Sequence, residues 1–129
     1  MREILFRGKS KDTNEWVYGD LLFCADTAQI WEDTDHGKFN CLVDPDSVGQ
    51  YTGMLDKNGC KIFEGDVIKH SARAFGELIT NLYEVRYSTE QARFLALLSS
   101  GVFNPTAFQD CEVVGNIFDN PELLGDDKT

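Results

Sequence analysis

The sequence lacks several features that would each place it in a familiar class of protein. It has no run of about 20 apolar residues, so we expect no helix that crosses a bilayer. Residues 1–7 are too few and too charged to form a secretory signal peptide. Neither a glycine-rich dinucleotide-binding pattern nor a phosphate-binding P-loop occurs. We therefore expect neither a membrane-spanning or secreted protein nor one of the common nucleotide-binding folds.

Cationic side chains are also scarce. The 129 residues include 12 Lys and Arg against 22 Asp and Glu, which gives a formal net charge of −10 at pH 7. A surface with this charge repels phosphate, so we expect no nucleic-acid partner and no attachment to an anionic membrane. The hydrophobic content of 42% is ample for a packed core. We expect a folded, cytoplasmic chain with one compact domain or two very small ones.

The cysteines and histidines show no metal-binding spacing. Two disulfides could form in three connectivities, but nothing in the sequence points to an oxidising compartment. A zinc site could use His36 or His70, yet the nearest His–Cys approach is the five-residue step from His36 to Cys41. We expect no metal, no cofactor and reduced thiols that are buried as small apolar side chains. The four thiols are those of Cys24, Cys41, Cys60 and Cys111.

Apolar and polar residues alternate along much of the chain, with many β-branched and aromatic side chains, and this pattern predicts a mainly β fold. In the turn at residues 56–59, Asn58 and Gly59 can each take a positive φ at low cost. Residues 71–76 are predicted to form a loop. The expected strands are residues 3–7, 15–24, 28–31, 39–43, 67–70, 82–87 and 111–118.

Residues 89–99 are ambiguous. Helix-forming residues behind Thr89, a plausible N-cap, favour a helix. The segment also follows an expected strand and could return as the partner of that strand, and propensity alone does not decide between the two. Further along, Asn120 could cap a single helical turn that Pro121 begins.

Gly65 and Asp66 form a pair that could suggest a catalytic or metal site. The stronger interpretation is structural, because a Gly-Asp step turns the backbone sharply while the carboxylate accepts hydrogen bonds from neighbouring amides. His36 and His70 have no Ser or Cys beside them that would suggest an activated nucleophile. We expect His36 in a polar loop and His70 at the end of a strand.

Two D-x-D pairs, Asp33 with Asp35 and Asp44 with Asp46, could supply oxygen ligands to Ca²⁺. The first is followed by Gly37 at the fifth place of the loop rather than the sixth, and the terminal Glu is missing. We expect solvated turn carboxylates instead. The acidic residues assigned to turns or to the C-terminal tail are Asp12, Asp33, Asp35, Asp44, Asp46, Asp56, Asp126 and Asp127.

Several aromatic residues could form a base-stacking platform of the kind that some small β barrels display. No basic groove accompanies them in the sequence, so the electrostatic half of that mechanism is missing. We expect core aromatics instead. The residues are Trp16, Tyr18, Trp31, Tyr51, Phe63, Tyr83 and Tyr87.

Two blocks of sequence resemble the YopX family of phage and prophage proteins. Residues 51–68, YTGMLDKNGCKIFEGDVI, are similar to the family block YTGLKDKNGKEIYEGDIV, with departures that include Met54 and Cys60. Residues 111–124, CEVVGNIFDNPELL, are similar to the closing block EVIGNIYENPELL. Residues 6–9 and 16–21 fit the opening of the family, whereas residues 71–82 are not diagnostic. The resemblance spans nearly the whole chain.

The resemblance implies a fold as well as a source. It implies a mainly β chain in which a β-rich N-terminal region, residues 1–48, precedes a small SH3-like barrel or roll, residues 49–124, and a flexible tail, residues 125–129. It also implies that residues 94–98 form a strand. Because the family has no established activity, the resemblance implies no catalytic, cofactor-binding or metal-binding residues.

Three functions follow as expectations. The first is a phage-encoded, non-enzymatic accessory module that binds an unidentified host or phage protein, with a homo-oligomer left open. The alternative is an acidic nucleic-acid mimic that occupies a host DNA-binding protein, although acidic residues confined to turns would not form the stripe that a mimic needs. The third is a small hydrolase or metal-dependent enzyme, which would require a His near two carboxylates in a cleft.

Overall fold

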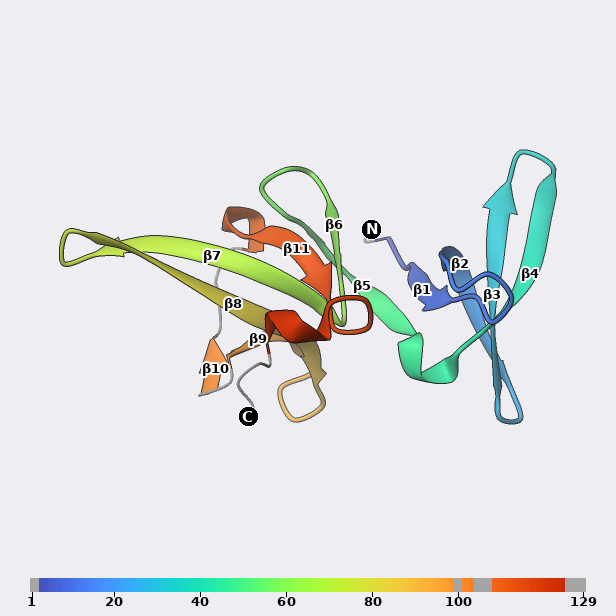
Figure 1. Ribbon diagram of the computed structural model, residues 1–129. Coiled ribbons are helices and arrows are strands. Elements are labelled where there is room, and N and C mark those ends of the chain that lie inside the picture. Colours follow the sequence, from blue (N-terminus) through green and yellow to red (C-terminus); the bar gives the residue numbers. More distant parts are fainter. Residues whose placement is uncertain (1–2, 99–100, 104–107, 125–129) are drawn as a thin grey trace. The chain divides into compact units, whose positions relative to one another are not determined.

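The computed structural model describes residues 3–98, 101–103 and 108–124. These residues fold almost entirely into antiparallel strands, which confirms the prediction of a mainly β protein (Figure 1). The described part of the chain contains three short 3-10 turns and no α-helix. Two compact units divide the chain between Gly53 and Met54. The SH3-like arrangement of the later half stays a prediction.

The first unit is built on an antiparallel sheet with the strand order β4-β3-β2-β1-β5. Its core consists of Val17, Ala28, Ile30 and Val43. At Gly19, a Cβ atom would overlap the carbonyl oxygen of Trp31, so a glycine is needed for β2 and β3 to lie this close. The strands are β1 (Phe6–Lys9), β2 (Trp16–Cys24), β3 (Thr27–Thr34), β4 (Gly37–Val43) and β5 (Gly49–Leu55), and a 3-10 turn, η1 (Pro45–Ser47), follows β4.

The second unit contains a five-stranded antiparallel sheet with the order β10-β9-β8-β7-β11. β5 continues past Gly53 into this unit, and β6 (Lys61–Phe63) is its neighbour in the strand order. The core joins Ile62, Ile68, Tyr83, Val85, Ala96, Phe108 and Cys111. The sheet strands are β7 (Asp66–Ala74), β8 (Glu77–Ser88), β9 (Arg93–Leu98), β10 (Gly101–Phe103) and β11 (Glu112–Asn116), with 3-10 turns η2 (Phe108–Asp110) and η3 (Pro121–Leu123).

The ambiguous segment is a strand, as the family resemblance implied. β9 pairs antiparallel with the end of β8, and Leu95 and Ala96 are buried. Across this pair the rings of Tyr87 and Phe94 meet edge to face with 5.1 Å between their centroids. Burial of these side chains on the sheet outweighs the modest helix propensity of the segment.

The structure differs from the local interpretation of the sequence at four places. Residues 71–76 are not a loop, because β7 continues to Ala74 and β8 begins at Glu77. In the turn at residues 56–59 only Gly59 takes a positive φ, and Asn58 does not. His70 lies in the middle of β7 rather than at its end. Asn120 precedes the predicted turn η3 but does not cap it, because its side chain accepts a hydrogen bond from the amide of Asn116. The predicted flexible tail, with Asp126 and Asp127, lies outside the described residues.

Candidate functional site

Asp56 is a buried connector rather than a solvated turn carboxylate, which corrects the sequence-based assignment. Only 4% of its surface is exposed. Oδ1 accepts hydrogen bonds from the amides of Asn58 and Cys60, both at 2.8 Å, and Oδ2 accepts one from the amide of Val113 at 2.9 Å. Burial alone would raise the pKa of Asp56, but these three donors and the nearby Lys57 outweigh it and lower the pKa. Both oxygens are therefore engaged by backbone amides of the second unit.

Asp66 has the structural role that the sequence predicted. Gly65 takes a φ of +93°, which turns the chain sharply between β6 and β7. The buried Asp66 carboxylate accepts a hydrogen bond from the amide of Phe63 at 2.7 Å. The Gly-Asp pair thus shapes the entry into β7.

The residues of the two D-x-D pairs lie in different elements of the first unit. Asp33 lies within β3 rather than in a turn, opposite Lys38 in β4, and Asp35 follows in the turn. Asp44 caps η1 through a hydrogen bond from the amide of Asp46 at 3.1 Å. Within residues 3–98, 101–103 and 108–124, no three His, Cys, Asp or Glu side chains converge in a way that could hold a metal ion.

The four thiols lie in different environments, and all are free. Cys111 is fully buried, as predicted, and burial together with the neighbouring Asp110 and Asp56 raises its pKa to about 11. Burial, reinforced by Glu32 and Asp12, also raises the pKa of the half-buried Cys41. Cys24 and Cys60 are exposed, so the predicted burial of these two side chains is wrong.

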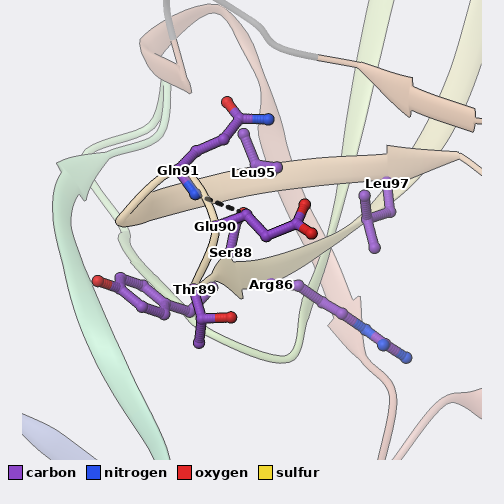
Figure 2. A pocket seen from close by; sticks show the side chains of 8 residues that line it. Arg86, Ser88, Thr89, Glu90, Gln91, Leu95 and Leu97 are labelled. Atoms are coloured by element: carbon purple, nitrogen blue, oxygen red, sulfur yellow. Dashed lines mark hydrogen bonds between the residues drawn. The ribbon is translucent and has the colours of Figure 1, made fainter.

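A hollow of about 400 Å³ lies at the turn between β8 and β9 (Figure 2). Arg86 and Glu90 supply its two charged groups, and Arg86 is held by a 2.7 Å hydrogen bond from its Nε to Glu84, which raises the pKa of Arg86. The residues that line this hollow include no His or Cys that could activate the hydroxyls of Ser88 and Thr89. The lining is Arg86, Tyr87, Ser88, Thr89, Glu90, Gln91, Leu95 and Leu97.

The most unusual feature of the second unit is the outer half of the β7–β8 hairpin, residues 71–80, which we call the distal arm. Figure 1 shows this hairpin reaching well beyond the ends of β9 and β11. β11 pairs with β7 only at residues 66–69, and β9 pairs with β8 only at residues 84–88. Every residue of the distal arm except Ala74 is exposed. The arm is thus a two-stranded ribbon with both faces open to solvent.

The tip of the distal arm is apolar. Phe75 and Gly76 form the turn with φ values of +55° and +80°, and two positive φ values are typical of a type I′ turn. Such turns favour Asn-Gly, and a side chain held in this left-handed region costs roughly 1–2 kcal/mol. The Phe75 side chain is nevertheless fully exposed, and Leu78 beside it is 61% exposed. Ile79 is also exposed. Three large apolar side chains are therefore exposed within five residues of sequence, with Leu78 and Ile79 on opposite faces of the ribbon.

A second apolar surface lies on the face of the β2–β3–β4 sheet that points away from the Ile30 core. Leu22, Gln29 and Leu42 stand side by side across the three strands, and both leucines are about half exposed. In the next row, Trp31 lies between Asp20 and Asn40. We call this surface the outer face.

The prediction that the aromatic residues are core residues is only half right. Tyr51, Phe63 and Tyr83 are buried. Tyr18, Trp31 and Tyr87 are exposed, and Trp16 is half buried, with the guanidinium of Arg7 at 4.3 Å from its ring centre. Trp31 lies on the outer face of the first unit, whereas Tyr87 lines the hollow of the second unit beside Arg86, so these exposed rings belong to different surfaces.

These features define a small antiparallel β protein of two units that presents apolar side chains on its surface. The chain belongs to the YopX family, because the family model described as YopX protein matches residues 5–125. Its fold is similar to the crystal structure of protein EF1440 from Enterococcus faecalis, with a TM-score of 0.61 at 22% identity. That match covers 97% of this chain and 100% of the other. No curated protein matches the sequence at a significant level.

Sequence reasoning missed the distal arm. The usual hairpin signal, Asn-Gly between two alternating segments, is absent because Phe75 occupies the place of the asparagine. The run of Leu78, Ile79 and Thr80 after Gly76 is typical of a strand and could have indicated the hairpin.

Proposed function

We propose that this YopX-family protein is a non-enzymatic, protein-binding module that is encoded by a phage or prophage and acts in the bacterial cytoplasm. The observation that carries the proposal is the exposure of large apolar side chains at the distal arm and on the outer face. Clustered apolar residues on a protein surface commonly mark interaction sites. Burying them against a partner is favourable by about 25 cal/mol per Å².

The arrangement of the polar groups supports a non-enzymatic role. The two buried carboxylates, Asp56 and Asp66, accept hydrogen bonds from backbone amides and shape turns. The hollow beside Arg86 places the hydroxyls of Ser88 and Thr89 near the carboxylate of Glu90, but its lining includes no His that could complete a charge-relay arrangement. No helix in the described part of the chain has the length and hydropathy of a membrane span.

The proposal is tested by purifying the tagged full chain from a bacterium that carries the corresponding phage or prophage. Quantitative mass spectrometry should find at least one host or phage protein in near-stoichiometric amount, and an unrelated acidic protein with the same tag should not retain it. Recovery of no partner, together with a monomeric mass in light scattering, would contradict the proposal.

The alternative, a nucleic-acid mimic, draws its support from the net charge of −10. Its support is weaker because acidic side chains of the first unit are engaged locally: Asp20 lies 3.7 Å from the Lys38 ammonium, and Asp44 caps η1. A mimic should compete with duplex DNA for a host DNA-binding enzyme at low salt. Absence of competition would eliminate this alternative.

A further inference from the structure

The distal arm is a poorly supported part of the second unit as the structure describes it. Two-stranded ribbons are only marginally stable in water without a sheet or helix packed against them. Apart from their own pairing, residues 71–80 pair with no other strand among the described residues. An extended ribbon that serves no internal packing is well suited to reach a second molecule.

Neither folding nor solubility explains the residue at the tip. Asparagine at position 75 would suit the left-handed turn better and would be well hydrated. Phe75 instead places a whole phenyl ring in water. Aromatic side chains are the residues that most often dominate binding energy when they fill a pocket in a partner.

The charge around the tip indicates what the partner carries. Residues 67–83 contain a single acidic residue, Glu77, although acidic residues outnumber basic ones in the chain as a whole. Lys69 lies near Glu112, at 3.6 Å, whereas Arg73 makes no ion pair in the part of the chain that the structure describes. Arg73 is the cross-strand partner of Leu78, so the two side chains share one face of the arm. A carboxylate on the partner would complement Arg73 there.

We propose that the distal arm is the docking element of this protein, with Phe75 as its anchor. This inference rests on the proposed protein-binding function and names the site and the partner surface. The partner is a folded protein with an apolar pocket wide enough for one phenyl ring and a carboxylate on the pocket rim that faces Arg73. Leu78 and Ile79 cover the pocket edge and exclude water from it.

A lipid bilayer or a nucleic acid fits the arm less well. Inserting the tip into a bilayer would carry Glu77, two residues from Phe75, toward the hydrocarbon region. On DNA, the arm would contribute only one arginine and one carboxylate. The chain as a whole has a net charge of −10, so the DNA phosphates would repel it. Both remain measurable outcomes of the test.

The test uses the tagged full chain with Phe75→Asn and the matched control Phe23→Asn, which replaces a phenylalanine that is 58% exposed in β2. Recovery of co-purified protein is measured by quantitative mass spectrometry, and each variant is melted in parallel. Phe75→Asn should keep or raise the melting temperature and lower recovery of the partner at least tenfold. Phe23→Asn should leave recovery within twofold of the parent chain. Arg73→Glu should lower recovery more than Arg73→Lys.

A photo-crosslinking phenylalanine analogue placed at position 75 gives a second measurement that needs no loss of binding. It should join the arm to the same protein, at a peptide with apolar residues and a carboxylate, while the analogue at position 23 should not. Equal recovery with the parent chain and Phe75→Asn would overturn the docking site but leave the proposed function standing. Recovery of nothing with either chain would overturn both.

Three other outcomes would also overturn the inference. The first is a crosslink from position 75 to a second copy of this chain. The second is Phe75-dependent binding to vesicles of phosphatidylcholine and phosphatidylglycerol. The third is Phe75-dependent binding to a 20-base-pair DNA duplex.

Discussion

At the scale of single residues, Asp56 joins two segments of the second unit that are far apart in the sequence. Its two oxygens accept hydrogen bonds from the turn at residues 58–60 and from Val113 at the start of β11. Nothing in the local sequence distinguishes this aspartate from the exposed ones. The sequence predicts the turn, but only the tertiary fold brings the amide of Val113 to the carboxylate.

The lowered pKa of Asp56 makes the stability of the second unit depend on pH. A carboxylate with a folded-state pKa below its ordinary value of 3.8 stabilises the fold above that value, and the contribution is lost as pH falls through the folded-state pKa. Asp56→Asn should therefore lower the free energy of unfolding by about 1–3 kcal/mol at pH 7. It should also flatten the fall in stability as the pH drops below the ordinary Asp pKa of 3.8. Urea unfolding followed by circular dichroism measures both effects.

Asp46→Asn is the matched control for this measurement. Asp46 is exposed in η1, where its backbone amide donates a hydrogen bond to the side chain of Asp44. This variant should keep the stability and the pH dependence of the parent chain. Equal behaviour of the two variants would contradict the connector role of Asp56.

The thiols should differ strongly in reactivity. Only the thiolate is nucleophilic, and Cys111 combines full burial with a pKa raised to about 11. Iodoacetamide at pH 8 should modify the exposed Cys24 and Cys60 within minutes and leave Cys111 unmodified until the protein unfolds. Peptide mapping at successive times gives the order in which the cysteines are modified. Rapid modification of Cys111 in the native protein would contradict the packing of this core.

At the scale of elements, the alternation of side chains and the turn residues predict most strands. The secondary structure of two segments, however, depends on tertiary contacts. Residues 93–98 carry helix-forming side chains, but Leu95 and Ala96 become buried against β8, and burial decides the strand. The sequence predicts a loop at residues 71–76 because polar and apolar side chains alternate only weakly there. Phe75 also stands where a hairpin turn usually has an asparagine. The docking element lies in the segment where the sequence signal is weakest, because a surface shaped for a partner need not follow the rules of core packing.

The distal arm should open independently of the sheet that carries it. Residues 71–80 have both faces exposed, whereas Ile68 and Val85 are buried in the core. Amide protons of the arm should exchange at least a hundredfold faster than those of the β7–β8 segment near Ile68 and Val85. Hydrogen exchange resolved by residue measures this gradient. Equal protection along the whole hairpin would mean that another surface packs on the arm.

At the scale of the whole molecule, this chain and protein EF1440 share a fold at 22% identity, so two sequences that differ at most positions support the same architecture. The family assignment and the mainly β class could be predicted from two sequence blocks. The placement of Phe75 at the end of an unsupported ribbon could not, because it depends on where β9 and β11 stop pairing.

Removing the distal arm tests the central claim most directly. His70 and Asn81 are cross-strand partners, four residues back on each strand from Ala74 and Glu77, so they occupy the same type of pair that flanks the present turn. Replacing residues 71–80 with Asn-Gly should therefore close a type I′ hairpin in register and leave the melting temperature within about 5 °C of the parent. A docking role for the arm predicts that this shortened chain, purified beside the parent chain from the same bacterium, keeps its fold and recovers at least tenfold less of the partner protein. Undiminished recovery of the partner by the correctly folded, shortened chain would contradict it.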